Sequence, residues 1–301
     1  MSARYSSAIF VIFFPAIVAL NSCQQLSPPL VIPCYGHVDS ISYHFDTLLI
    51  KENSKWSDIT DAWVYLDNNP VGAFQMPCTF PMITGSGAHT ITIYPGIMIN
   101  GTPDTRTKYP FYTYFTETVN LTQGKTIKFE PSCTFTSFAH FAWMEYFSTG
   151  CSITKNNIMS DTIMTRVTNG GYPYKCYGSA ILDSIDPSHY TNVYQGISDT
   201  MTLPKDGATA VYLEVYYNCN AVVSVGLYES VPGYALPGQQ LAPVTYLFPT
   251  GNGWEKMYIN LQSIVAANPK GEPFTVYFEM YRNSGTTSPT YLYLDDIKLI
   301  D

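Results

Sequence analysis

Alternation of apolar and polar residues over short segments is the feature that most constrains this chain. The segment 209–218 reads TAVYLEVYYN. In an extended strand, one side would carry Val211, Leu213, Val215 and Tyr217, and the other side Ala210, Tyr212, Glu214 and Tyr216. Neighbouring side chains of a strand point to opposite faces, so the first, apolar set is expected to face a core.

Similar runs follow one another along the chain and are separated by turn residues such as Asn68-Asn69-Pro70 and Gly85-Ser86-Gly87. The 25 Tyr and 16 Phe favour strands, and the 21 Pro and 20 Gly favour turns. We therefore predict an all-β protein with two β-sandwich domains. The smaller, N-terminal domain would span 37–132 and the larger, C-terminal jelly roll 133–301.

The segment 64–97 carries a motif of the N-terminal domain. Its parts are Asp67-Asn68, Val71-Gly72, Pro77 with Pro81, and the run Gly87 to Ile91. This order resembles the PEGA-type and related Ig-like modules of bacterial envelope proteins, which implies a small Ig-like β-domain. His89 lies in this motif with no second metal ligand near it in sequence, so a structural role is expected.

The last 50 residues resemble the end of carbohydrate-binding-module jelly rolls. The resemblance rests on Gly253-Trp254-Glu255-Lys256, Ile259-Asn260-Leu261, Phe274 to Phe278 and Leu294 to Leu299. It implies a jelly-roll fold, and in this pattern Trp254 is expected to pack in the core.

The first residues resemble a lipoprotein signal peptide over 1–22. Arg4 is followed by the apolar run 8–20 and then by Leu20-Asn21-Ser22-Cys23, which is similar to a bacterial lipobox. Cys23 would be lipidated, including by palmitate, and 23–36 would be a tether. The resemblance implies an outer-membrane lipoprotein, on the periplasmic face or the cell surface.

Six further cysteines, at positions 34, 78, 133, 151, 176 and 219, form no CxxC motif. In an exported protein they could pair as disulfides or stay as buried thiols, and the sequence leaves both alternatives open.

Tyrosines gather in two segments with the composition of loops, 169–179 and 188–196. They are Tyr172, Tyr174, Tyr177, Tyr190 and Tyr194. Exposed loop tyrosines suit contacts with a glycan or a protein, so these five are candidate ligand-binding residues.

Three carboxylates are candidate ligands of a structural Ca²⁺, the one cofactor considered. Jelly rolls of the family named above often hold this ion between the first and last strands. Here Glu145 and either Asp295 or Asp296 could meet in that way, since calcium prefers oxygen ligands.

Asp followed by Ser or Thr and then an aliphatic residue occurs five times. This resembles the O-glycosylation pattern of Bacteroidota extracytoplasmic proteins. The acceptors would be Ser40, Thr47, Thr162, Ser184 and Thr200.

Composition and motifs narrow the function. Charged residues are 13% of the chain and its formal net charge is −8, which argues against nucleic acid as a partner. HExxH, GxSxG and P-loop motifs are absent, so an enzyme is not expected. The leading hypothesis is a non-catalytic envelope lipoprotein that binds a glycan through the jelly roll. The alternatives are a structural or adhesin subunit of fimbrial type with an envelope protein partner and, less favoured, a glycan hydrolase.

Overall fold

The computed structural model describes residues 32–44, 57–157, 160–170, 176–183, 192–251, 253–282 and 288–301. Nearly every element in them is a strand, and their one helix is the short α2 (Gln262–Ala267). The protein is therefore all-β, as the alternation predicts. The described part of the chain contains no helix that has the length and apolarity needed to span a membrane.

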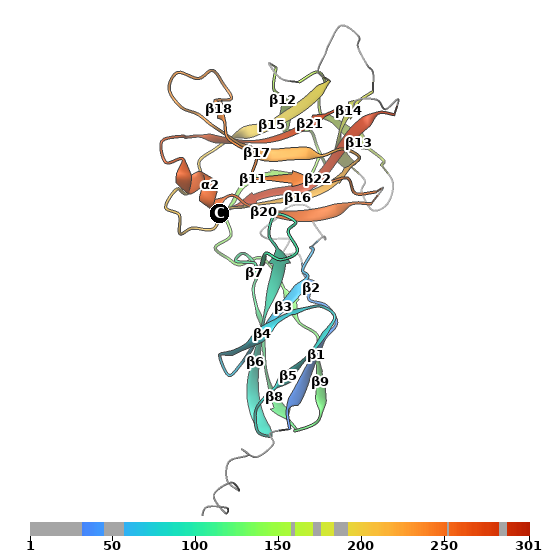
Figure 1. The fold of residues 1–301 in the computed structure, drawn as a ribbon, viewed down its shortest axis with the longest axis vertical. Helices are drawn as coiled ribbons and strands as arrows, with labels where there is room; N and C mark the ends of the chain where they lie inside the picture. Colours follow the sequence, from blue (N-terminus) through green and yellow to red (C-terminus); the bar gives the residue numbers. More distant parts are fainter. Residues whose placement is uncertain are drawn as a thin grey trace, which may run out of the picture.

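The strands divide into an N-terminal unit, β1 to β10, and a C-terminal sandwich, β11 to β22 (Figure 1). The largest sheet of the N-terminal unit has the order β4-β3-β6-β7, and β8 also pairs with β6. Its strands are β3 (Asp61–Leu66), β4 (Asn69–Gln75), β6 (Gly87–Met98), β7 (Arg106–Lys108) and β8 (Phe115–Leu121).

Two smaller sheets complete the N-terminal unit. Strand β1 (Cys34–Val38) pairs antiparallel with β5 (Cys78–Met82) and parallel with β9 (Thr126–Phe129). Strand β2 (Ser42–Tyr43) pairs with β10 (Ser132–Cys133). The core of this unit is made of buried side chains from the sheet that contains β3 and β6 and from the sheet that contains β1, β5 and β9. Among them are Val64, Phe80, Ile91, Ile93 and Phe129.

The turn between β3 and β4 explains the role of His89. Asp67 and Asn68 have φ values of 48° and 66°, the left-handed conformation that tight hairpins require. His89 Nδ1 lies 2.7 Å from Asp67 Oδ2, and the Thr90 amide donates to Asp67 Oδ1 over 2.9 Å. These hydrogen bonds lower the pKa of Asp67, first through His89. His89 therefore stabilises the turn between β3 and β4, which is the structural role expected for it.

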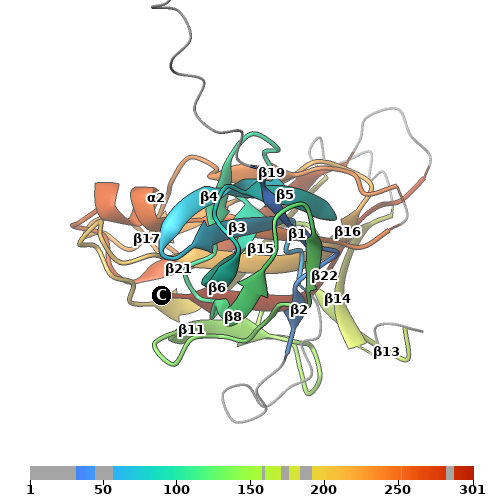
Figure 2. The same cartoon turned by 90° about the horizontal axis from the view of Figure 1, so that it is seen from below.

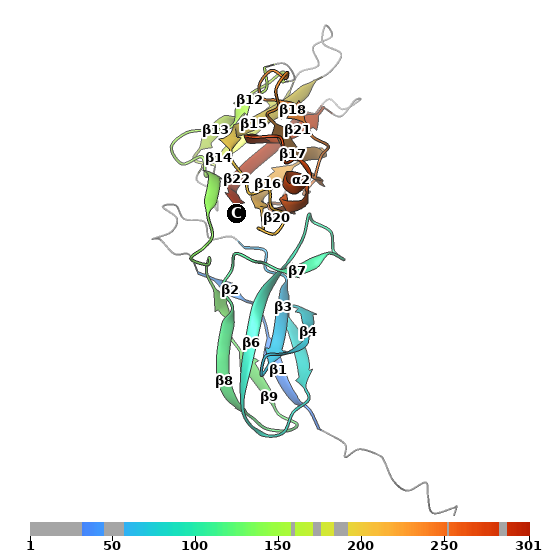
Figure 3. The same cartoon turned by 90° about the vertical axis from the view of Figure 1, so that its left-hand side faces the viewer.

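The C-terminal sandwich has two layers (Figures 1 and 3). Sheet I has the order β13-β14-β22-β16-β20, and β11 also pairs with β22. Its strands are β11 (Phe141–Glu145), β13 (Thr165–Thr168), β14 (Cys176–Leu182), β16 (Tyr212–Cys219), β20 (Glu255–Asn260) and β22 (Thr290–Ile300).

Sheet II has the order β12-β15-β21-β17-β18, and β19 also pairs with β17. Its strands are β12 (Thr154–Lys155), β15 (Val193–Met201), β17 (Val223–Glu229), β18 (Gln239–Gln240), β19 (Thr245–Leu247) and β21 (Phe274–Tyr281).

The predicted faces of the segment 209–218 are confirmed. Leu213, Val215 and Tyr217 lie in the core between the two sheets. On the other face, however, Tyr212 and Glu214 are also buried, because the N-terminal unit covers that end of sheet I. Tyr216, further from that unit, stays partly exposed, as does Ala210 at the start of the segment.

Aromatic rings form the joint between the two units. Tyr109 of the N-terminal unit lies 5.3 Å from Tyr212 and 4.9 Å from Tyr258, between ring centroids. The turn after β6 adds polar contacts: the Asn100 amide donates to the Tyr258 carbonyl, and the Asn260 amide donates to Asn100 Oδ1.

Beside these rings lies a buried charge cluster made of Glu214, Lys256, Asp296 and Lys298. Lys256 Nζ is 2.6 Å from Glu214 and 3.3 Å from Asp296, and Lys298 Nζ is 2.5 Å from Asp296. The Tyr109 hydroxyl donates to Glu214 Oε1 over 2.7 Å, so the cluster is also tied to the N-terminal unit. Two cations and two anions balance one another without solvent, as buried charges require.

The structure holds all six described cysteines as free thiols. Cys34, Cys133 and Cys219 are buried, whereas Cys78, Cys151 and Cys176 are partly exposed. The structure therefore favours the thiol alternative over disulfides.

We predict that Lys256→Met destabilises the protein by about 3–5 kcal/mol, because it removes the closest cation of Glu214 and leaves the buried cluster with one uncompensated negative charge. The matched control is Lys205→Met, since Lys205 pairs with Glu272 at the surface and such pairs contribute about 0–1 kcal/mol. Denaturant unfolding monitored by fluorescence would measure both. Equal losses in the two variants would contradict a dominant role of the charge cluster.

We also predict that iodoacetamide leaves Cys133 and Cys219 unmodified in the native protein. Burial raises the pKa of each thiol to about 12, so the reactive thiolate is scarce. Mass spectrometry of the peptides would show Cys176 labelled and these two protected until guanidinium is added. Peptides linked through two of these cysteines without reduction would show that the thiols pair.

Candidate functional site

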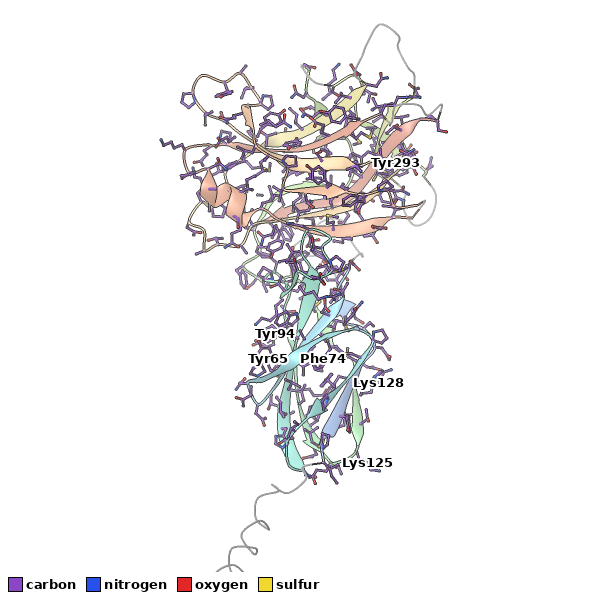
Figure 4. All side chains as sticks on the ribbon, viewed as in Figure 1. Tyr65, Phe74, Tyr94, Lys125, Lys128 and Tyr293 are labelled. Carbon is purple, nitrogen blue, oxygen red and sulfur yellow. The ribbon has the colours of Figure 1, made fainter. Side chains whose placement is uncertain are left out.

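Sheet I exposes a group of aromatic side chains at the end that the N-terminal unit leaves uncovered. Viewed from below, β13 and β14 lie to one side of that unit (Figure 2), and Tyr293 of β22 lies on the same side (Figure 4). We call this group the aromatic platform. Its members are Tyr177 of β14, Tyr216 of β16, Tyr291 and Tyr293 of β22, and Trp254 just before β20.

Strand alternation points these side chains outward. Their neighbours Ala180, Leu182, Leu292 and Leu294 face the core between the sheets, so the positions between them face away from it. Each of the five platform residues is half-buried. The platform is therefore a surface feature that rests on the outer face of one sheet.

Contacts between the rings make the platform continuous. Tyr293 lies 5.2 Å from Tyr177, 6.5 Å from Trp254 and 4.6 Å from Tyr291, between ring centroids. The rings of Tyr291 and Tyr293 are stacked at 20°, and Trp254 is tilted by 31° from Tyr293 and by 34° from Tyr216. Such packing holds the rings in place before any ligand binds.

Polar groups lie among the rings. In the strand register, Tyr293 stands opposite Ser179 on one side and Asn218 on the other, and both of these residues are buried. Asp295, two residues further along β22, faces Tyr216. Burial raises the pKa of Asp295 to about 7, so near neutral pH its carboxyl group can both donate and accept hydrogen bonds.

Rigid aromatic faces with a few polar groups suit a ligand that has apolar faces and a polar rim. A sugar ring has this character: its C–H faces pack on aromatic rings and its hydroxyls bond to carboxyl and amide groups. The platform thus has the chemistry of a glycan-contact surface.

The structure places only part of the predicted tyrosine group on this surface. Tyr177 belongs to the platform. Tyr194 does not: it lies in β15 inside the sandwich core with no exposed area, so its assignment to an exposed loop is wrong. Its ring fits there because Gly196, beside it, has no side chain. Tyr172, Tyr174 and Tyr190 lie outside the described residues.

The prediction that Trp254 packs in the core is also wrong, because this residue lies on the platform. Met257 and Ile259 face the core, which turns Trp254 and Lys256 to the other side. The same alternation in Tyr291-Leu292-Tyr293-Leu294 was the sequence signal that could have revealed the platform.

The proposed calcium ligands do not form a metal site. Strands β11 and β22 do pair, with Glu145 opposite Ile297. Yet both oxygens of Glu145 accept backbone amides, from Phe147 and Ser152, and Asp296 is neutralised by Lys256 and Lys298. In the described ranges, no group of three or more His, Cys, Asp or Glu could hold a metal ion, so Glu145, Asp295 and Asp296 do not make one.

Three of the predicted glycosylation acceptors can be located. Ser40 and Thr200 are exposed, and Thr162 is half-buried. Thr47 and Ser184 lie outside the described residues. Modification of these side chains remains a prediction.

No protein-family model and no curated protein matches this sequence. Among solved structures, the chain is similar to the CBM22-1 xylan-binding domain of Paenibacillus barcinonensis Xyn10C. The identity is 11% and the TM-score 0.38, over 55% of this chain and 96% of that chain. It is also similar to the N-terminal CBM22-1–CBM22-2 tandem domain of the same Xyn10C, at 12% identity and a TM-score of 0.39, over 80% of this chain and 73% of that chain.

A third similar structure is the K1 cleaved adhesin domain of Lys-gingipain from Porphyromonas gingivalis W83. Its identity to this chain is 13% and its TM-score 0.35, over 52% of this chain and 96% of that chain. Similarities at this level do not assign the chain to a family, so the function has to be argued from its own residues.

We predict that Asp295→Asn changes how stability depends on pH. The pKa of Asp295 is about 7 in the folded protein and ordinarily 3.8, so the folded state holds this proton more tightly. Wild-type stability conferred by the protonated group is full below pH 3.8 and is lost as pH rises towards 7. The Tm difference, Asn variant minus wild type, should therefore grow across that interval and then stay constant. A difference independent of pH would contradict the raised pKa.

Proposed function

We propose that this protein is a non-catalytic glycan-binding protein of the bacterial cell envelope, and that the aromatic platform is its binding surface. The observation that carries the proposal is the continuous layer of Tyr177, Tyr216, Trp254, Tyr291 and Tyr293 on an uncovered sheet face. A pre-positioned aromatic surface binds with little loss of side-chain entropy.

The ligand class that fits best is a neutral polysaccharide. The sequence carries a formal net charge of −8, and Asp295 stands beside the platform, opposite Tyr216 in the strand register. The negative charge of the protein would repel an anionic polysaccharide, whereas a neutral polysaccharide would not be repelled. The neighbouring rings of Tyr291, Tyr293 and Trp254 offer several aromatic contacts to the sugar rings of such a chain.

The proposal includes attachment to the membrane through a lipid on Cys23. It is supported by the apolar run 8–20 and the lipobox-like residues 20–23. A tether over 23–36 would leave the β-domains free to reach glycans at the outer membrane.

Three buried glutamates, Glu145, Glu214 and Glu279, give no support to a hydrolase. Glu214 is bonded to Lys256 and Tyr109, Glu145 to backbone amides, and Glu279 to Gln195 and Tyr281. Each is engaged in holding the fold. Glycoside hydrolysis requires two carboxyl groups that flank the sugar, with at least one free to act on it.

A subunit that assembles by donating its C-terminal strand is also less well supported. Strand β22 is paired along both sides, with β14 and β11 on one edge and β16 on the other. Removing it would split sheet I and expose its core residues Leu292, Leu294 and Leu299.

We predict that Trp254→Ala and Tyr293→Ala each weaken polysaccharide binding by about tenfold or more, which corresponds to about 1.4 kcal/mol. Affinity electrophoresis in gels containing soluble xylan, β-glucan, mannan, galactan or starch would identify the ligand and measure the loss. Tyr234→Ala is the matched control, since Tyr234 is 57% exposed and lies away from the platform in a loop of sheet II.

Unchanged thermal stability in the variants would show that the loss is local. Wild-type binding that persists in both platform variants would contradict the platform as the binding surface. No retardation of the wild-type protein on any of the five polysaccharides would count against the proposed ligand class.

A further inference from the structure

Sheet II carries a second exposed patch, on the opposite side of the sandwich. Val222, Tyr246, Phe248 and Tyr281 have exposed fractions of 46%, 44%, 61% and 50%. They come from β17, β19 and β21 or the residues directly beside them. Large apolar side chains are common singly on protein surfaces, but adjacent ones mark contact sites.

The strand register shows that these four side chains are neighbours. Val223 stands opposite Leu247 and also opposite Met280, and all three are buried in the core. The residues one step further along, Val222, Phe248 and Tyr281, therefore lie at one level and point outward. Ser224, on the same face, stands opposite Tyr246 and Glu279, so the patch continues into a second row.

A chain of hydrogen bonds fixes the polar side of this patch. The Tyr281 hydroxyl donates to Glu279 Oε1 over 3.1 Å, and Gln195 Nε2 donates to Glu279 Oε2 over 2.5 Å. Gln195 Oε1 in turn accepts from Asn156 and Tyr228. Glu279 itself is buried and both of its oxygens are bonded, so it fixes the Tyr281 hydroxyl and places a negative charge beside the exposed Tyr281 ring.

Two more hydroxyl groups on the patch can bond to a ligand. In the part of the chain that the structure describes, the Ser224 and Tyr246 hydroxyls form no side-chain hydrogen bond. Exposed aromatic rings and these hydroxyls again match a neutral, hydroxyl-rich ligand. An anionic ligand would be repelled by Glu279, and a purely apolar partner would leave these polar groups without bonds.

We propose that this patch, defined by Val222, Ser224, Tyr246, Phe248, Glu279 and Tyr281, is a second glycan-binding surface. The two surfaces occupy the outer faces of the two layers, which point in opposite directions (Figures 1 and 3). One straight glycan segment cannot contact both, so the protein binds two chains and links them. The inference rests on the proposed function for its ligand class, but its residues are separate.

The test compares the wild-type full chain with two double variants and one control variant. The sheet I variant carries Trp254→Ala and Tyr293→Ala, and the sheet II variant carries Tyr246→Ala and Tyr281→Ala. The control variant carries Tyr234→Ala. Calorimetry with hexasaccharides of the five polysaccharides named above gives the number of sites. Light scattering of the protein with the long polysaccharides reports linking of chains. Thermal unfolding verifies that each variant folds.

We expect the wild-type protein to bind two hexasaccharides and either double variant to bind one. Only the wild type and the control variant should link polysaccharide chains. One site in the wild type, lost in the sheet I variant and kept in the sheet II variant, would overturn this inference and leave the proposed function intact. One site that is lost only in the sheet II variant would overturn the aromatic platform instead. No binding at all, or binding of protein rather than glycan at the sheet II patch, would overturn the second surface.

Discussion

The buried charge cluster at the joint is the constraint on which the rest of the structure depends. Glu214, Lys256, Asp296 and Lys298 come from three strands of sheet I, and none can be left unpaired away from water. Tyr109 adds a donor from the N-terminal unit. Because a shift of one unit against the other would break this hydrogen bond and unpack the rings around it, the joint holds both units in a defined relation.

This joint also divides the outer face of sheet I into three zones. Next to the N-terminal unit, Tyr212 and Tyr258 pack into its core. The charge cluster follows, and beyond it Tyr216, Trp254 and Tyr293 remain partly exposed. The same strands thus provide an internal interface at one end and a candidate binding surface at the other, and the position of the N-terminal unit decides where one ends and the other begins.

The sequence predicted more of the fold than of the site. Alternation in 209–218 correctly separated the core side chains from the outward ones, since burial follows a period of two in strands. The predictions for Tyr194 and Trp254 rested on other grounds and were wrong: the loop-like composition of 188–196 placed Tyr194 outside, and the resemblance to carbohydrate-binding-module jelly rolls placed Trp254 in the core. For Tyr194 the answer depended on Gly196, which leaves room for the ring, and for Glu145 on the amides of a loop that folds back onto it.

By itself, the amino-acid sequence determined that the chain folds as strands, that many of them have one apolar and one polar or aromatic face, and that turn residues separate them. Local geometry suffices for this, because each residue acts within its own strand. Only the tertiary structure decided which outward residues are buried and which are exposed. Tyr212 and Tyr293 are both tyrosines on the same face of one sheet. Tyr212 nevertheless lies under the N-terminal unit, whereas Tyr293 lies on an uncovered surface. That difference arises from packing between segments far apart in the chain, which no local pattern encodes.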